Sequence, residues 1–247
     1  LGARGLGLGM NVDVGVREPD VWPLAVQGPR AEDLVARVFG DDIRSVRYFS
    51  FLECDFHSRQ LVVARSGYSK QGGYEIYLDD SPLGITLWDT LWEAGADLQV
   101  APGCPNLIER IEAGLLSYGN EMTRENNPLE INLDRFCHLE GEIDYIGRSA
   151  LEAIAAQGPS QRMRGLLIDG TPCPPCGKPW PVLVGNIKVG QVTSAIWSPA
   201  FRQNVGLSLI DKDHWNPGTP VTVLLPDGHE LGAVITSLPF TVSSSTP

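Results

Sequence analysis

An acidic residue interrupts an otherwise apolar strand pattern in the segment ARSGYSKQGGYEIYL, residues 64–78. Successive side chains of a strand point to opposite faces, so Tyr74 and Ile76 share one face while Glu75 and Tyr77 share the other. A buried carboxylate is costly unless it accepts hydrogen bonds. Glu75 therefore either faces water, which strand patterning alone favours, or awaits a partner that donates hydrogen bonds.

Other chemistry-bearing patterns are weaker. Cys173 and Cys176 have the spacing of a redox or zinc motif, but no second ligand pair lies at a suitable distance, and the pattern favours a proline-rich surface loop without metal. The sequence contains no G-x-S-x-G elbow and no P-loop, and the glycines of GARGLGLG lack a following helix pattern. The charges of Glu109, Arg110 and Glu112 are expected on a solvated helix face.

The composition excludes several functional classes. The chain has 247 residues, of which 20% are charged, and a formal net charge of −11. An acidic chain without a long basic cluster is a poor candidate for binding nucleic acid. No apolar run approaches the ~20 residues that cross a bilayer. The five cysteines are an odd count that does not resemble a disulfide framework, so we expect reduced thiols and a cytoplasmic protein.

Residues 21–120 predict an α+β domain, a ferredoxin-like α/β sandwich with helices on one face of an antiparallel sheet. Helix signals include Pro29 and Gly40 at the ends of one helix and Ser81 as the N-cap of another. The predicted strands are 21–28, 45–56, 59–68, 74–78 and 98–103, and the predicted helices are 29–40, 81–95 and a third that runs from about 104 to Gly119.

The remaining segments differ in composition and in their secondary-structure patterns. Residues 121–160 are polar and include a small helix after Gly147, which is typical of a connector. Residues 161–247 contain short, evenly spaced strand patterns separated by turn residues, which predict a C-terminal β-barrel. Residues 1–20 begin with Leu1 and have no start signal. We expect them to be the remnant of an N-terminal part that is missing here.

Two sequence segments are specific enough to indicate a protein family. ARSGYSKQGGYEIYL and APGCPNLIERIEAGLLSYGNEM resemble the tetrahydrofolate-dependent methyltransferases of the glycine cleavage T-protein family, and within it the bacterial dimethylsulfoniopropionate demethylases. The resemblance runs from about Val21 to Phe240. It implies a folate-binding α+β domain followed by a β-barrel, with tetrahydrofolate as the cosubstrate.

The resemblance also implies four folate-binding residues. The family motif S-R-T-G-Y-T-G-E-D-G-F-E-I places a tyrosine and a glutamate against the pterin ring, and these match Tyr68 and Glu75. Tyr77 would stand beside them on the same strand face, and Phe49 matches a ring that packs on the pterin. In that setting Glu75 would accept hydrogen bonds from pterin N–H groups.

One departure bears on the reaction. Asn106 stands where T-proteins carry a folate-contacting arginine, which counts against aminomethyl transfer from a lipoyl carrier. The resemblance implies demethylation of dimethylsulfoniopropionate to methylmercaptopropionate, with a small-molecule methyl donor as partner and a homodimer as an option. An aminomethyltransferase, an amine or O-demethylase, and a non-catalytic folate-binding protein are the alternatives. No catalytic residue is assigned, because the catalytic aspartate of the family lies upstream of this chain.

Overall fold

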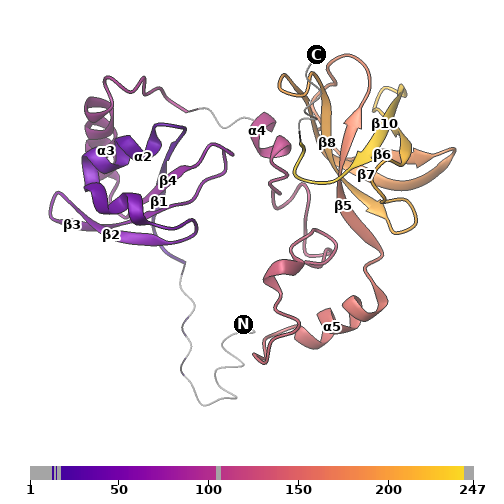
Figure 1. Ribbon diagram of the computed structural model, residues 1–247, viewed down its shortest axis with the longest axis horizontal. Coiled ribbons are helices and arrows are strands. Elements are labelled where there is room, and N and C mark those ends of the chain that lie inside the picture. The colour runs from indigo at the N-terminus through magenta and orange to yellow at the C-terminus, as the bar shows by residue number, and fades with distance from the viewer. Residues whose placement is uncertain (1–12, 14, 16–17, 104–106, 242–247) are drawn as a thin grey trace. The chain divides into compact units, whose positions relative to one another are not determined.

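The computed structural model describes residues 13, 15, 18–103 and 107–241 (Figure 1). The chain divides into two compact units, Leu1–Cys104 and Pro105–Pro247. No helix within the described ranges is long and apolar enough to cross a membrane.

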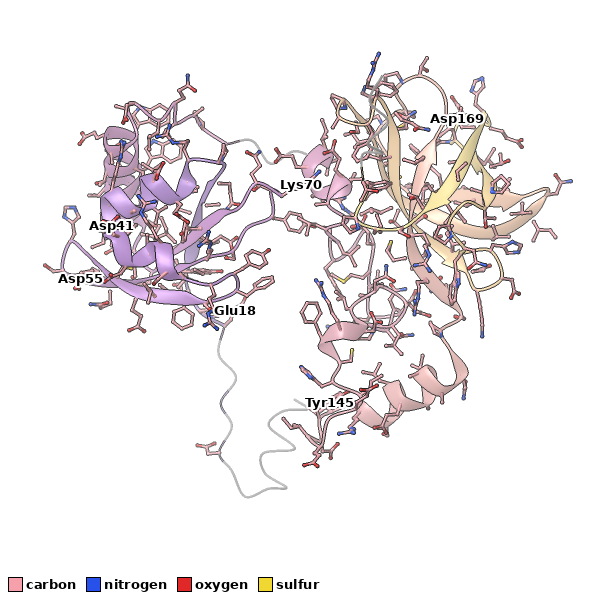
Figure 2. All side chains as sticks on the ribbon, viewed as in Figure 1. Glu18, Asp41, Asp55, Lys70, Tyr145 and Asp169 are labelled. Atoms are coloured by element: carbon pink, nitrogen blue, oxygen red, sulfur yellow. The ribbon has the colours of Figure 1, made fainter. Side chains whose placement is uncertain are left out.

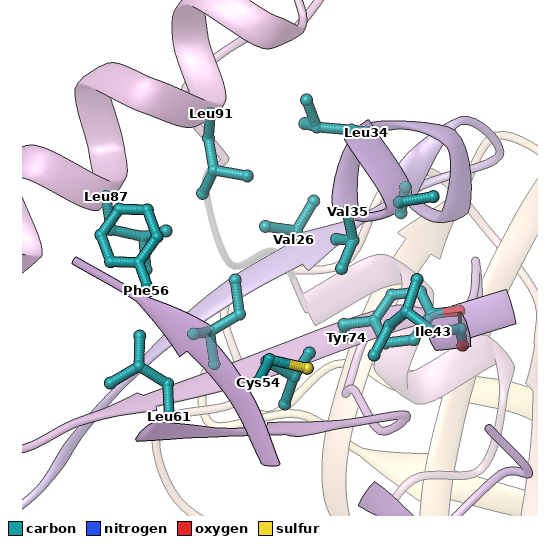
Figure 3. Packing of buried hydrophobic residues seen from close by; sticks show 14 of the residues in the cluster. Val26, Leu34, Val35, Ile43, Cys54, Phe56, Leu61, Tyr74, Leu87 and Leu91 are labelled. Carbon is teal, nitrogen blue, oxygen red and sulfur yellow. Dashed lines mark hydrogen bonds between the residues drawn. The ribbon is translucent and has the colours of Figure 1, made fainter. Parts of the chain in front are cut away.

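The first unit is an antiparallel sheet with helices on one face, as predicted. Its four strands have the order β1-β4-β3-β2. Helices α2 and α3 both contact β4, and their apolar residues close the core above the sheet (Figure 3). The elements are β1 (Trp22–Gln27), α2 (Ala31–Phe39), the 3-10 helix η1 (Asp41–Ser45), β2 (Phe51–Phe56), β3 (Arg59–Ala64), β4 (Gly73–Leu78) and α3 (Ser81–Ala94).

Strand β4 alternates as the sequence predicts. Tyr74 and Ile76 are only 1% and 0% exposed and belong to the core under the helices. Tyr74 is labelled in Figure 3. The Tyr74 hydroxyl donates a hydrogen bond to the Ile43 carbonyl, with 3.2 Å between the oxygens, so its polar end is satisfied within the core. Glu75 and Tyr77 consequently lie on the opposite, half-buried face of the sheet.

Helix α3 begins at a cap that the sequence analysis placed one residue too late. The capping side chain is Asp80, whose backbone is extended and whose Oδ1 accepts a hydrogen bond from the Leu83 N–H at 3.4 Å. Ser81, the predicted cap, is instead the first residue of the helix. Aspartate in the extended conformation can satisfy an otherwise unpaired N–H of the first turn, which is why it caps well.

This assignment gives a direct test. We expect Asp80→Ala to lower the free energy of unfolding by ~1 kcal/mol, the usual value of a side-chain cap. Ser81→Ala is the matched control and should change it by less than ~0.5 kcal/mol, because Ser81 is exposed and makes no cap. Urea denaturation of the two variants measures both values. A larger loss for Ser81→Ala than for Asp80→Ala would show that the cap is misassigned.

Four predicted elements differ from the structure, and two of them, the strands predicted at 45–56 and 59–68, are present but shorter, as β2 (Phe51–Phe56) and β3 (Arg59–Ala64). Residues 98–103 form turns and irregular backbone, so the strand predicted there is wrong. The helix predicted to reach Gly119 is α4 (Leu107–Glu112) and ends much earlier. Its end is a Schellman motif in which Gly114 has a φ of +68°, the Leu115 N–H bonds to the Arg110 carbonyl at 2.8 Å, and the Gly114 N–H bonds to Ile111.

The second unit contains the predicted β-barrel. Six antiparallel strands close in the order β10-β5-β8-β7-β6-β9. Alternate residues of β5 point to different sides: Leu166 and Ile168 fill the barrel interior, while Met163 packs outside against Ile111 of α4. The elements are η2 (Asp134–Phe136), α5 (Arg148–Gln157), β5 (Gln161–Ile168), β6 (Trp180–Val184), β7 (Ile187–Ser198), β8 (Gln203–Asp211), β9 (Pro220–Leu224) and β10 (Glu230–Thr236).

Candidate functional site

Small side chains flank Glu75 on its face of the sheet. Strand pairing places Ala25 of β1 and Ala64 of β3 directly on either side of Glu75, and Tyr77 lies two residues further along the same face. Two methyl side chains cannot cover a glutamate, so a planar ring has room to lie beside it. Within the described residues, the one hydrogen bond to the Glu75 carboxylate comes from the Ser66 hydroxyl, which leaves most of its acceptor positions for another donor.

The loop between β3 and β4 is fastened beside this carboxylate by Gln27 of β1. The Gln27 amide donates to the Ser66 carbonyl at 3.0 Å and accepts from the Ser69 hydroxyl at 2.8 Å. A Cβ atom at Gly67 would lie 2.0 Å from Gln27 Oε1, so a larger residue there would displace the Gln27 amide from this contact. The fastened loop carries Tyr68, which is half exposed, and Lys70, labelled in Figure 2.

Phe49 lies at the same end of the sheet. Its N–H donates to the Arg65 carbonyl at 2.9 Å, one residue before Ser66. Its φ is +61°, an uncommon value for a residue with a side chain, and its ring is 73% exposed beside Tyr48. The backbone therefore brings Phe49 and the Tyr68 loop to the end of the sheet where Glu75 lies. Their roles in binding a ligand stay predictions.

A pocket of about 230 Å³ opens elsewhere in this unit, around the start of α2. Its lining includes Glu32, Arg65 and Tyr74, but neither Glu75 nor Tyr77. Arg65 is occupied there by an ion pair with Glu32 at 3.0 Å and lies over the Tyr74 ring. A cavity shared by Glu75 and Tyr77 stays a prediction, whereas their shared sheet face is confirmed.

The predicted solvated face of α4 is wrong for two of its three charges. Arg110 and Glu112 are 4% and 6% exposed. The Arg110 guanidinium donates to Glu121 Oε2 at 2.9 Å and to the Ser194 hydroxyl at 2.7 Å, and Glu112 accepts from the Ser198 hydroxyl. These groups fasten α4 to strand β7. The apolar residues on both sides of ERIE were a signal of burial, but the partners come from distant parts of the chain.

The predicted position of Cys173 and Cys176 on a loop is confirmed. The Cys173 N–H donates to the buried Asn204 side chain at 2.9 Å, and burial raises the pKa of Cys176 to about 11. A thiol with that pKa is protonated at neutral pH and is a weak nucleophile and metal ligand. The described ranges hold no group of three or more His, Cys, Asp or Glu side chains arranged to bind a metal. The absence of zinc stays a prediction, as does any role for Asn106, which lies outside the described residues.

Comparison with known proteins matches both units. The family model for the GCVT N-terminal domain matches residues 4–141, and the model for the glycine cleavage T-protein C-terminal barrel domain matches residues 161–241. A solved structure with the same fold is the glycine cleavage system aminomethyltransferase T from Bartonella henselae, with a TM-score of 0.72 at 23% identity over 90% of this chain and 60% of that one.

Two curated relatives differ in how similar they are to this chain. Dimethylsulfoniopropionate demethylase DmdA of Ruegeria pomeroyi is 54% identical over 224 residues, which cover 91% of this chain and 61% of that protein. The aminomethyltransferase of Caldanaerobacter subterraneus subsp. tengcongensis is 33% identical over 206 residues, which cover 82% of this chain and 54% of that protein. The chain thus spans between 54% and 61% of the length of these two relatives.

Proposed function

The chain belongs to the glycine cleavage T-protein family, and on that basis we propose that it is part of a tetrahydrofolate-dependent demethylase acting on dimethylsulfoniopropionate. The observation that carries the proposal is the 54% identity to a demethylase named for this donor, against 33% to an aminomethyltransferase. The products are methylmercaptopropionate and 5-methyltetrahydrofolate.

The residues around Glu75 fit a pterin ring. A carboxylate accepts two parallel hydrogen bonds from the N–H edge of a pterin, and Glu75 has acceptor positions left beyond the one that Ser66 fills. The alanines on both sides give the ring an apolar bed. Tyr68, Tyr77 and Phe49 are the aromatic side chains that we assign to the rest of the folate site.

The chemical step asks the protein mainly for positioning. A sulfonium is an activated leaving group, so the C–S bond breaks as the bond from carbon to N5 forms, its electron pair stays on sulfur, and the N5 proton is released. Bound tetrahydrofolate supplies N5 as the methyl acceptor. Tyr68 and Tyr77 are candidates to stabilise the cationic donor, by ~0.5–2 kcal/mol for each aromatic face. Alignment of donor and acceptor and exclusion of water account for the remainder.

Methyl transfer by the complete gene product tests this function. The protein is incubated with tetrahydrofolate and either dimethylsulfoniopropionate or a lipoyl-bound aminomethyl donor, and folate products are separated by mass. We expect 5-methyltetrahydrofolate from the first donor and no product from the second. The reverse result would show that the protein is an aminomethyltransferase. This is the second candidate function, because an aminomethyltransferase is 33% identical to this chain. Folate binding without turnover of any donor would assign a non-catalytic binding protein.

The same proposal includes a cytoplasmic location and a small-molecule partner. The described cysteines Cys54, Cys137, Cys173 and Cys176 are free thiols, which persist in reducing compartments. The net charge of −11 repels nucleic acid phosphates. A homodimer is part of the proposal too, and light scattering of the purified protein measures it.

A further inference from the structure

Two arginines and a tryptophan gather at one end of the barrel. Arg162 and Arg164 begin strand β5 and point to the same side as Leu166 and Ile168, the interior of the barrel. Trp215 comes from the loop that follows β8. The guanidinium carbons of Arg162 and Arg164 lie 5.3 and 5.8 Å from the centre of the Trp215 ring. All three side chains are half-buried, so the cluster is accessible from solvent.

The charges of this cluster are not neutralised. Within the part of the chain that the structure describes, Arg164 donates only to neutral carbonyls, those of Trp215 at 2.8 Å and Met163 at 3.2 Å. The Nε of Arg162 is buried and has no hydrogen-bond partner. Across the described ranges, no carboxylate pairs with either guanidinium, in contrast to Arg110, which is buried against Glu121.

This arrangement is unfavourable unless something supplies negative charge. The Trp215 ring stabilises each guanidinium, but two like charges beside one ring still repel each other, and a buried N–H without an acceptor costs free energy. Burial, reinforced by the nearby charge of Arg162, holds the pKa of Arg164 below its usual range. A chain with 30 acidic residues had many carboxylates that could have been placed here. If a bound ligand supplies the negative charge, no carboxylate of the protein is needed beside Arg162 and Arg164.

We propose that Arg162, Arg164 and Trp215 form a binding site for a small oxyanion, a carboxylate or a phosphate. The planar guanidinium of Arg162 presents its N–H groups as a fork that matches two oxygens of such an anion. Arg164 adds a second positive charge, and the Trp215 ring forms an apolar wall on which the guanidinium groups are held. The site lies within the barrel unit, and its existence does not depend on the folate site.

Anion binding by the full chain tests the proposal. Isothermal titration with inorganic phosphate, and separately with acetate, is compared with sodium chloride at equal ionic strength. Arg162→Gln should weaken the binding of the preferred anion about 10-fold or more, because a charged donor pair is lost. Lys188→Gln is the control of equal charge change, since Lys188 is an exposed residue of the barrel strand β7, and it should bind as the original chain does. Binding of phosphate alone identifies a phosphate site, and binding of both anions a general oxyanion site.

Thermal unfolding separates a ligand site from a structural role. Without added anion, Arg162→Gln should unfold at the same or a higher temperature, because it removes repulsion with Arg164. A lower unfolding temperature would show that Arg162 stabilises the fold itself and would overturn the proposal, as would equal anion binding by the variant and the original chain. If Arg162→Gln does not fold, Arg162→Lys keeps the charge but loses the planar fork, and it must still bind the anion more weakly.

Discussion

Replacing Glu75 by glutamine is expected to weaken the binding of tetrahydrofolate by ~1–3 kcal/mol, about 5- to 150-fold in Kd. The substitution keeps the shape of the side chain but turns one acceptor oxygen into an N–H donor. That donor then faces an N–H of the pterin, and a buried polar group is left unpaired. The KM for the methyl donor should change little, since Glu75 is assigned to the other ligand. Titration of each substrate in the complete gene product gives both values.

The same sheet face supplies the control for this prediction. Glu53 of β2 points to the same side of the sheet as Glu75, because it pairs with Val62 of β3, which in turn pairs with Tyr77 of β4. It is exposed, so Glu53→Gln makes the same chemical change without touching the assigned site. An equal loss of folate affinity in the two variants would show that the loss comes from the net charge of this sheet face and not from a contact between Glu75 and the pterin. An equal loss for folate and donor in Glu75→Gln would mean that Glu75 contacts the sulfonium.

The parts of this molecule that sequence could predict are the local ones. Alternation within β4 requires only the pattern Tyr-Glu-Ile-Tyr, and it placed Tyr74 and Ile76 in the core correctly. The end of α4 was also encoded locally, by Gly114, but the apolar residues after it continued the helical spacing and hid the stop. Where two local signals compete, as they do there, the tertiary packing decides.

The surroundings of Glu75 depend on strand register and could not be predicted. That Ala25 and Ala64 flank its carboxylate follows from pairing of β4 with β1 on one side and β3 on the other. The Gln27 amide reaches the Ser66 carbonyl across 39 residues of sequence. A single sequence gives the candidates for each strand but not the residue opposite each position, and a slip by one residue would turn Glu75 to the core.

The buried charges of α4 show the same limit in its clearest form. A charge pattern on a short helix usually marks a solvated face. Arg110 can be buried because its guanidinium donates hydrogen bonds to Glu121 and to Ser194, which lies 84 residues away in sequence. Glu112 can be buried because it accepts a hydrogen bond from Ser198, 86 residues away. The apolar neighbours of ERIE indicate burial, but nothing within the helix identifies the partners that satisfy these charges.

Replacing Arg110 by methionine is expected to lower the free energy of unfolding of the second unit by ~3–5 kcal/mol, the cost of leaving one member of a buried ion pair behind. Glu121, whose side chain has no exposure, keeps hydrogen bonds from the Ser117 N–H at 2.7 Å, the Thr193 hydroxyl at 3.3 Å and the Ser194 hydroxyl. These donors satisfy its oxygens in part but do not replace the positive charge. Urea denaturation followed by the fluorescence of the barrel tryptophans measures the loss.

Three further variants, one of them the single variant Glu121→Gln that completes the double-mutant cycle, decide whether that loss comes from the ion pair. Glu152→Gln breaks a pair with Arg148 whose carboxylate is exposed, and it should cost less than ~1 kcal/mol because water screens that charge. Arg110→Met combined with Glu121→Gln removes the stranded charge and should recover part of the stability lost by Arg110→Met alone. Because the two side chains are in contact, their effects should not add. Simple additivity in this double-mutant cycle would mean that Arg110 stabilises the unit by packing its methylene chain, and that its pairing with Glu121 contributes little.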